Sequence, residues 1–245
     1  MIIPKPEDAL HQSWLVRLLV ELADDSVLNQ TLIFKGGTCA AMLDRLDRFS
    51  VDLDFDLADS KKKDVVKTQL LKCVDGLGLQ VKTQSQRGIQ ILAKYPVGKP
   101  RQRNTIKVEV QFPSPKANQY AATYIPCIDR TLLCHTPETM LANKLVAITD
   151  RFKKHQSLAG RDVYDIHHFL NQGLRYESPV IEERTGLKPL AYLKMLKEFI
   201  AKHVTNTTLS EDLNMLLAPE RFQRIRKTLK TETLLLIDAE TKRYH

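Results

Sequence analysis

Carboxylates at alternate positions mark the stretch DRFSVDLDFDL, residues 47–57. Asp52, Asp54 and Asp56 alternate with apolar residues, and this period of two predicts a strand with one apolar and one acidic face. Neighbouring carboxylates on one face repel and raise each other's pKa. A divalent cation removes that conflict, and Mg²⁺ accepts one or two carboxylates together with substrate phosphates. We therefore predict that Asp52 and Asp54 bind Mg²⁺, with Mn²⁺ as an alternative, and we treat Asp56 as peripheral.

A third carboxylate comes from the stretch TIKVEVQF, residues 105–112. Its apolar residues alternate with Lys107, Glu109 and Gln111, which predicts a second half-buried strand. On the phase of that strand alone, Glu109 is our candidate for a third metal ligand. Two ions held by such carboxylates can activate an attacking hydroxyl and stabilise a leaving pyrophosphate.

Two glycines precede the acidic strand in LIFKGGTCAAML, residues 32–43. Gly36 and Gly37 stand where a short predicted strand passes into a predicted helix. Glycine lets the backbone approach a ligand closely, and helix N-terminal amides with the Thr38 hydroxyl can bind phosphate oxygens. Alone, Gly-Gly-Thr is more often a tight turn and Asp-x-Asp more often surface decoration. The order strand, Gly-Gly-Thr, helix and Asp-x-Asp strand is far more specific.

The sequence FKGGTCAAMLDRLDRFSVDLDF closely resembles the signature of the AbiEii/AbiGii-type nucleotidyltransferases. These are toxin components of abortive-infection and type IV toxin–antitoxin systems, within the DNA polymerase β-like nucleotidyltransferase superfamily. The matching segments are Lys35 to Thr38 and Arg48 to Phe55. Cys39 stands where Ala is more usual, a change that we expect to be harmless. The resemblance covers about residues 28–170, and the C-terminal 75 residues match only as generic helices.

The second half carries further residues of that resemblance. ETMLANKLVAITDR resembles the family's helix with a Lys and an Arg two turns apart, here Lys144 and Arg151. Residues seven apart return nearly to one helix face, so both cations can point at one anionic ligand. A solvated helix face is the alternative, which their order behind the glycine turn and acidic strand disfavours. GRDVYDIHHF resembles the Arg-Asp-x-x-Asp element and provides Asp162 and Asp165.

The resemblance implies a role for each matched residue. Asp52 and Asp54 would bind Mg²⁺, and Lys144 with Arg151 would bind the triphosphate and offset charge in the transition state. Asp162 would be a catalytic or positioning carboxylate, supported by Asp165. The residues expected to contact the nucleotide phosphates are Gly36, Gly37, Thr38 and Ser50.

The elements that must position these residues predict an α+β fold. We expect a nucleotidyltransferase-type mixed β-sheet with flanking helices over 1–133, and a helical domain over 134–245 that completes the active site. Strands are predicted at 31–34, 51–57, 79–84, 88–95 and 105–112, and a loop at 113–126. Helices are predicted at 7–22, 38–46, 61–76, 136–152, 160–173, 188–203 and 219–238.

Composition bounds the class of protein and its partners. The formal net charge of +8 favours polyanionic partners. Basic residues cluster at 61–63, 98–104 and 221–227, although solvated surface is an equal explanation for each cluster. The four cysteines lack Cys-x-x-Cys spacing, which favours a reduced cytosolic compartment over a disulfide framework or zinc site. We see no signal peptide and no apolar run long enough to span a membrane, and expect a cytoplasmic protein.

The first functional hypothesis is an enzyme that transfers a nucleoside monophosphate from an NTP to an acceptor hydroxyl. The resemblance implies a toxin that modifies RNA, with a tRNA 3′ end as the expected acceptor and a cognate antitoxin as a partner. One rival transfers the nucleotide to a protein or a small molecule. Another is a nucleotide-binding protein without turnover, which intact Asp-x-Asp, Gly-Gly-Thr and Lys elements disfavour.

Overall fold

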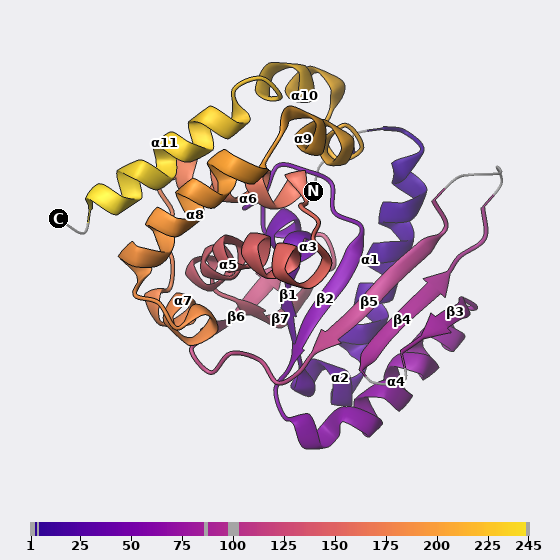
Figure 1. Ribbon diagram of the computed structural model, residues 1–245. Coiled ribbons are helices and arrows are strands. Elements are labelled where there is room, and N and C mark those ends of the chain that lie inside the picture. Colours follow the sequence, from indigo (N-terminus) through magenta and orange to yellow (C-terminus); the bar gives the residue numbers. More distant parts are fainter. Residues whose placement is uncertain (1–2, 4, 86–87, 98–102, 244–245) are drawn as a thin grey trace. The chain divides into compact units, whose positions relative to one another are not determined.

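The computed structural model describes residues 3, 5–85, 88–97 and 103–243, which form two compact units (Figure 1). The first unit comprises Met1–Arg45, Phe49–Ser114 and Tyr120–His135. The second comprises Leu46–Arg48, Pro115–Gln119 and Thr136–His245. Two short segments, 46–48 and 115–119, therefore leave the first unit and fold with the second.

A seven-stranded mixed sheet forms the centre of the first unit, in the order β3-β4-β5-β2-β1-β7-β6. The β2–β5 and β1–β7 pairs are parallel and the other pairs are antiparallel. The strands are β1 (Leu32–Lys35), β2 (Asp52–Leu57), β3 (Gln80–Gln84), β4 (Ile89–Lys94), β5 (Thr105–Gln111), β6 (Tyr120–Ile125) and β7 (Arg130–His135). The predicted α+β class with a mixed sheet is confirmed.

The apolar face of this sheet builds the core of the first unit. On β2, Leu53 and Phe55 are almost fully buried, as are Val108 on β5 and Ile91 on β4. Figure 1 shows α1 behind the sheet, and its leucine stripe is fully buried. Each buried side chain of this size stabilises the fold by about 1.5–3 kcal/mol. The helices of this unit are α1 (Asp8–Asp24), α2 (Ser26–Thr31), α3 (Gly36–Met42) and α4 (Lys63–Gly76).

Two strands and three short helices were not predicted from the sequence. The loop predicted at 113–126 was wrong in part, because β6 begins at Tyr120 and pairs antiparallel with β7. Ala121 and Ala122 carry too little side chain to show a clear alternation, and β6 lies at the edge of the sheet. The unpredicted helices are α2, α7 (Ser178–Thr185) and α9 (Asn206–Leu213).

Helices make up the second unit. They are α5 (Pro137–His155), α6 (Gly160–Asn171), α7, α8 (Pro189–His203), α9, α10 (Pro219–Ile225) and α11 (Leu229–Lys242). The predicted start of α5 is confirmed, since the Thr136 hydroxyl accepts a hydrogen bond from Thr139 N at 3.3 Å. The single helix predicted at 219–238 is instead two helices. At Gly160, a Cβ would lie 2.8 Å from the Leu209 Cα, so glycine permits the close contact of α6 with α9.

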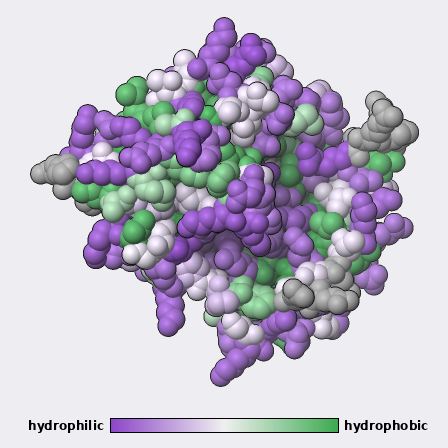
Figure 2. Space-filling view, viewed as in Figure 1, coloured by the Kyte–Doolittle hydropathy of each residue, from purple (hydrophilic) through white to green (hydrophobic). Residues whose placement is uncertain are grey.

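Hydrophilic side chains cover most of the face shown in Figure 2. Among the described residues, none of the helices combines the length and apolar character needed to cross a membrane.

Candidate nucleotidyltransferase site

The acidic face of β2 brings the three predicted metal-binding carboxylates together. In the sheet register, Asp54 lies opposite Glu109 on β5 and opposite Lys35 on β1, while Asp52 lies opposite Lys107. Neighbouring strands are about 4.8 Å apart, so carboxylates in register are within reach of one small ligand. The face predicted from sequence is confirmed, although it also carries two lysines.

Gly36 makes room for the Asp54 carboxylate. Its φ of +78° is a conformation that L side chains rarely adopt. A Cβ at this position would lie 2.5 Å from Asp54 Oδ2 and 3.0 Å from Asp54 Cβ. The glycine turn is therefore required both by its backbone conformation and by the carboxylate beside it.

Asp54 differs from its neighbours because its carboxylate has no hydrogen bond or ion pair with any described residue. Burial raises its pKa, the Asp52 carboxylate raises it further, and the charge of Lys107 opposes both effects. A half-buried carboxylate without a partner is costly unless a cation or donor joins it. Asp54 is therefore the part of this face that is most in need of a ligand.

Lys107 holds the third carboxylate. Its Nζ lies 2.7 Å from Glu109 Oε2 and 3.9 Å from Asp52 Oδ2. Burial would raise the pKa of Glu109, but the hydrogen bond and charge of Lys107, together with the charge of Lys35, lower it below its usual value. Sequence reasoning gave Lys107 no role, although its place two residues before Glu109 put both side chains on one face.

The carboxylates fit a magnesium ion that takes two protein ligands. Among the residues that the structure describes, no group of three or more His, Cys, Asp or Glu side chains is arranged to hold a metal. Mg²⁺ often binds through one or two carboxylates, with substrate phosphates and waters completing the octahedron. Asp52 and Asp54 supply two such carboxylates, and Glu109 is engaged by Lys107.

Asp56, treated as peripheral from the sequence, is instead the centre of a buried polar cluster. Its carboxylate is fully buried and lies 2.5 Å from Lys35 Nζ and 2.8 Å from His135 Nε2. Lys35 also donates to Gln111 Oε1 at 2.6 Å. Burial alone would raise the pKa of Asp56, but His135 and Lys35 hold it well below its usual range. This cluster ties β1, β2, β5 and β7 together beside Asp54.

Thr38 and Ser50 are also close together. The fully buried Thr38 hydroxyl donates to the Asp52 carbonyl at 2.5 Å and lies 2.9 Å from Ser50 Oγ. Thr38 thus fastens α3 to the start of β2. Nucleotide contacts by Thr38, Ser50, Gly36 and Gly37 remain predictions.

His11 on α1 supports the residue before Asp52. Its Nε2 donates to the Val51 carbonyl at 2.9 Å, and its Nδ1 lies 2.8 Å from the Tyr95 hydroxyl. Burial lowers the pKa of His11 to about 4, so the ring is neutral at physiological pH.

The second unit brings together Lys144, Arg151, Asp162 and Asp165. Lys144 Nζ lies 2.7 Å from Asp165 Oδ2 and 3.6 Å from Asp162 Oδ1. Arg151 Nε lies 3.1 Å from Asp162 Oδ2. The two cations of α5 therefore face the carboxylates of α6, and the predicted shared face of Lys144 and Arg151 is confirmed.

Arg48 completes this cluster, and its role was not predicted. Its Nε lies 2.6 Å from Asp165 Oδ1 and its Nη2 lies 2.8 Å from Asp165 Oδ2, and both residues are buried. Burial would raise the pKa of Asp165, but Arg48 and Lys144 lower it to about 2. Arg48 and Asp165 are 117 positions apart in the chain. The sequence therefore showed each of them as part of a motif but did not predict their contact.

Comparisons with known proteins agree with this geometry. The profile of one family, Nucleotidyl transferase AbiEii toxin, Type IV TA system, matches residues 17–241. The crystal structure of JHP933 from Helicobacter pylori superposes with a TM-score of 0.63 at 20% identity, covering 98% of this chain and 94% of that one. The crystal structure of a candidate nucleotidyltransferase from H. pylori gives a TM-score of 0.63 at 20% identity, covering 98% and 96%. No curated protein matches the chain.

The structural likeness at this identity establishes a shared fold, and the family match extends over nearly the whole chain. The protein therefore belongs to the AbiEii toxin family of type IV toxin–antitoxin systems and is a nucleotidyltransferase.

Proposed function

We propose that this nucleotidyltransferase moves a nucleoside monophosphate from an NTP to a hydroxyl of an RNA acceptor, a tRNA 3′ end, and that it requires Mg²⁺. The family implies an NTP substrate and an antitoxin partner. The observation that carries the proposal is the half-buried carboxylate of Asp54, beside Asp52. It has no partner among the described residues, and the adjacent Gly36 has no side chain that would cover it.

In this proposal Asp52 and Asp54 hold the metal. When bound, Mg²⁺ would favour the ionised acceptor hydroxyl and stabilise the leaving pyrophosphate. Glu109 joins the ligand set only when it gives up its hydrogen bond from Lys107. Lys107 is then free to contact a phosphate oxygen, so the same face serves metal and nucleotide.

The second unit would provide the cations for the triphosphate, as part of a helical domain over 134–245. Its cluster combines three cations, Arg48, Lys144 and Arg151, with the two carboxylates Asp162 and Asp165, a formal charge of +1. Arg48 and Lys144 share the Asp165 carboxylate, and the cluster keeps a net positive charge that Lys144 and Arg151 can offer to an anion. Asp162, which contacts both, positions these cations.

An RNA acceptor is supported by the net charge of +8. Of the basic runs predicted to contact RNA, residues 98–102 lie outside the described residues. A protein or small-molecule acceptor remains the second candidate, because the catalytic carboxylates alone do not choose the acceptor.

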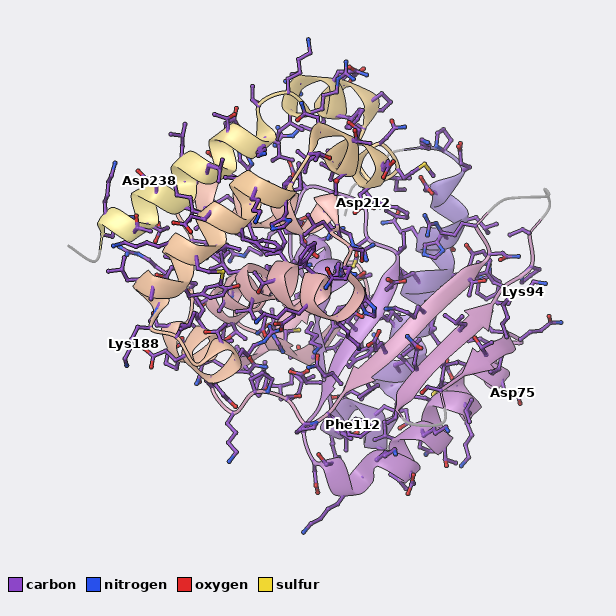
Figure 3. All side chains as sticks on the ribbon, viewed as in Figure 1. Asp75, Lys94, Phe112, Lys188, Asp212 and Asp238 are labelled. Atoms are coloured by element: carbon purple, nitrogen blue, oxygen red, sulfur yellow. The ribbon has the colours of Figure 1, made fainter. Side chains whose placement is uncertain are left out.

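The test incubates the purified protein with each α-³²P-labelled NTP, Mg²⁺ and total bacterial tRNA, and resolves the products on a denaturing gel. We expect label on RNA with wild-type protein and none with Asp52→Ala. Asp75→Ala, which removes an exposed acid from α4 (labelled in Figure 3), is the matched control and should label RNA normally. Label on the protein, or on nothing, would move the acceptor away from tRNA.

Metal binding is tested separately by thermal unfolding. Mg²⁺ with an NTP should raise the melting temperature of the wild type, and Asp54→Asn should remove most of that gain. Equal gains in both proteins would contradict the proposed metal site.

A further inference from the structure

An aromatic cluster with unpaired basic neighbours lies where α5 and α8 end. The ring centroids of Phe152 and Phe199 are 5.1 Å apart, in an edge-to-face arrangement. His203 lies 4.7 Å from the Phe152 ring and 4.8 Å from the Phe199 ring. All three rings are partly exposed, so the cluster is not part of the buried core.

Basic residues are close to these rings along the same two helices. Lys153, Lys154 and His155 occupy the last turn of α5, and Lys202 occupies the last turn of α8. The three lysines are exposed, and none of them forms an ion pair with a described residue. Residues three or four apart share a helix face, so His155 lies on the side of Phe152, and Lys202 on the side of Phe199. Glu198 is the acidic residue nearest in sequence to the cluster.

The basic run at 221–230, in contrast, is largely occupied by structural contacts. Arg221 Nη2 lies 3.0 Å from Asp47 Oδ2. The Arg226 guanidinium lies over the Phe222 ring, 5.9 Å from its centroid. Lys230 Nζ donates to the carbonyls of residues 201 and 204 at 2.8 Å each, at the C-terminal end of α8. That last contact adds a further positive charge beside the aromatic cluster.

We propose that Phe152, Phe199 and His203, with Lys202 beside them, form a platform that binds single-stranded RNA. Partly exposed rings offer faces on which unstacked bases can stack, and Lys202 can neutralise a phosphate. A duplex keeps its bases stacked on each other and cannot use the rings in this way. The surface thus fits the free end of an RNA rather than a helical stem.

The platform also lies on the helix that carries the proposed triphosphate cations. Phe152 directly follows Arg151 and is eight residues beyond Lys144, a rise of about 12 Å along α5. This inference deepens the proposed function, on which it rests, by assigning a surface to the RNA acceptor.

The experiment measures binding of a fluorescently labelled single-stranded RNA, and KM and kcat for labelling of tRNA. Phe199→Leu keeps apolar volume but removes a stacking face, so it should raise Kd and the KM for RNA roughly 5- to 150-fold. Its kcat at saturating RNA and its KM for NTP should stay unchanged, and Phe199→Trp should restore binding. The same strand in a duplex should bind all three proteins equally weakly.

Lys202 is tested through salt dependence. Lys202→Glu should reduce the slope of log Kd against log salt by about 0.7, since each phosphate contact on a single strand contributes about that much. Lys188→Glu is the matched control, because Lys188 is 82% exposed at the opposite end of α8 (Figure 3). It should leave the slope unchanged.

The outcomes separate this inference from the proposed function. Wild-type binding and KM in both platform variants, with RNA labelled normally, would overturn the platform alone. Failure of wild-type protein to bind single-stranded RNA would also overturn it. Binding that depends on the platform residues, without any label on RNA, would support the platform and overturn the proposed acceptor reaction.

Discussion

Replacement of Gly36 by alanine tests whether the glycine turn serves Asp54. The backbone there has φ of +78°, and for a side chain this conformation costs about 1–2 kcal/mol. In a chain of this length that cost lowers the melting temperature by roughly 2–8 °C. The new Cβ would also lie 2.5 Å from Asp54 Oδ2, so the carboxylate must move by several tenths of an ångström or more. Because displacement of a reacting group by about 1 Å costs about 100-fold in rate, activity should fall far more than stability.

Gly78→Ala separates the two effects. Gly78 belongs to the same unit and has φ of +67°, but a Cβ there would meet no atom within 4 Å. We expect the two variants to lose similar stability, whereas only Gly36→Ala loses nucleotidyl transfer and the stabilisation by Mg²⁺. The assays are thermal unfolding with and without Mg²⁺ and NTP, and label transfer at a temperature where both variants are folded. Equal transfer activity in both variants would refute the reasoning, since the carboxylate would then tolerate the added methyl group.

Three further variants test the surrounding clusters. Arg48→Met should reduce the free energy of unfolding by about 3–5 kcal/mol in urea titrations, because it leaves the Asp165 carboxylate buried without its bidentate partner; a loss below 1 kcal/mol would contradict this. Lys107→Met should tighten Mg²⁺ binding without nucleotide by about tenfold, since it removes a positive charge beside Asp52 and releases Glu109; weaker binding in a calorimetric titration would contradict it. The pKa of His11 is lowered from 6.5 to about 4. Between these pH values His11 takes up a proton in the unfolded chain but not in the folded one. The free energy of unfolding therefore falls by about 3 kcal/mol as the pH drops from 6.5 to 4. His11→Gln should flatten that dependence, and an unchanged pH profile would show that His11 is not its source.

The sequence was most informative where a pattern repeats along the chain. Alternation on β2 and β5 placed Asp52, Asp54 and Glu109 on one face, and the spacing of Lys144 and Arg151 placed both on one side of α5. Both arrangements depend only on the period of a strand or helix. Motif resemblance then supplied the family, which the comparisons confirm.

The period of a strand or helix does not predict which side chains will pair across different strands or helices. Asp54 and Asp56 occupy equivalent positions in the alternation, yet Asp56 is enclosed by Lys35 and His135. His135 contacts Asp56 from β7, and no local sequence pattern predicts that β7 pairs with β1. The pairing of Arg48 with Asp165 likewise depends on tertiary packing between distant segments.

The fold tolerates the acidic side chains of β2 and β5 because neighbouring residues compensate their negative charges to different degrees. Lys35 and His135 compensate the charge of Asp56, and Lys107 compensates that of Glu109, so neither carboxylate leaves an uncompensated charge. Asp54 has no such partner among the described residues and lies behind a residue that lacks a side chain. Natural selection for stability alone would favour the replacement of Asp54, because an unpaired, half-buried carboxylate destabilises the fold. The protein retains Asp54 and the glycine beside it. This is expected when a bound cation compensates the charge of Asp54 and the site functions to bind that cation.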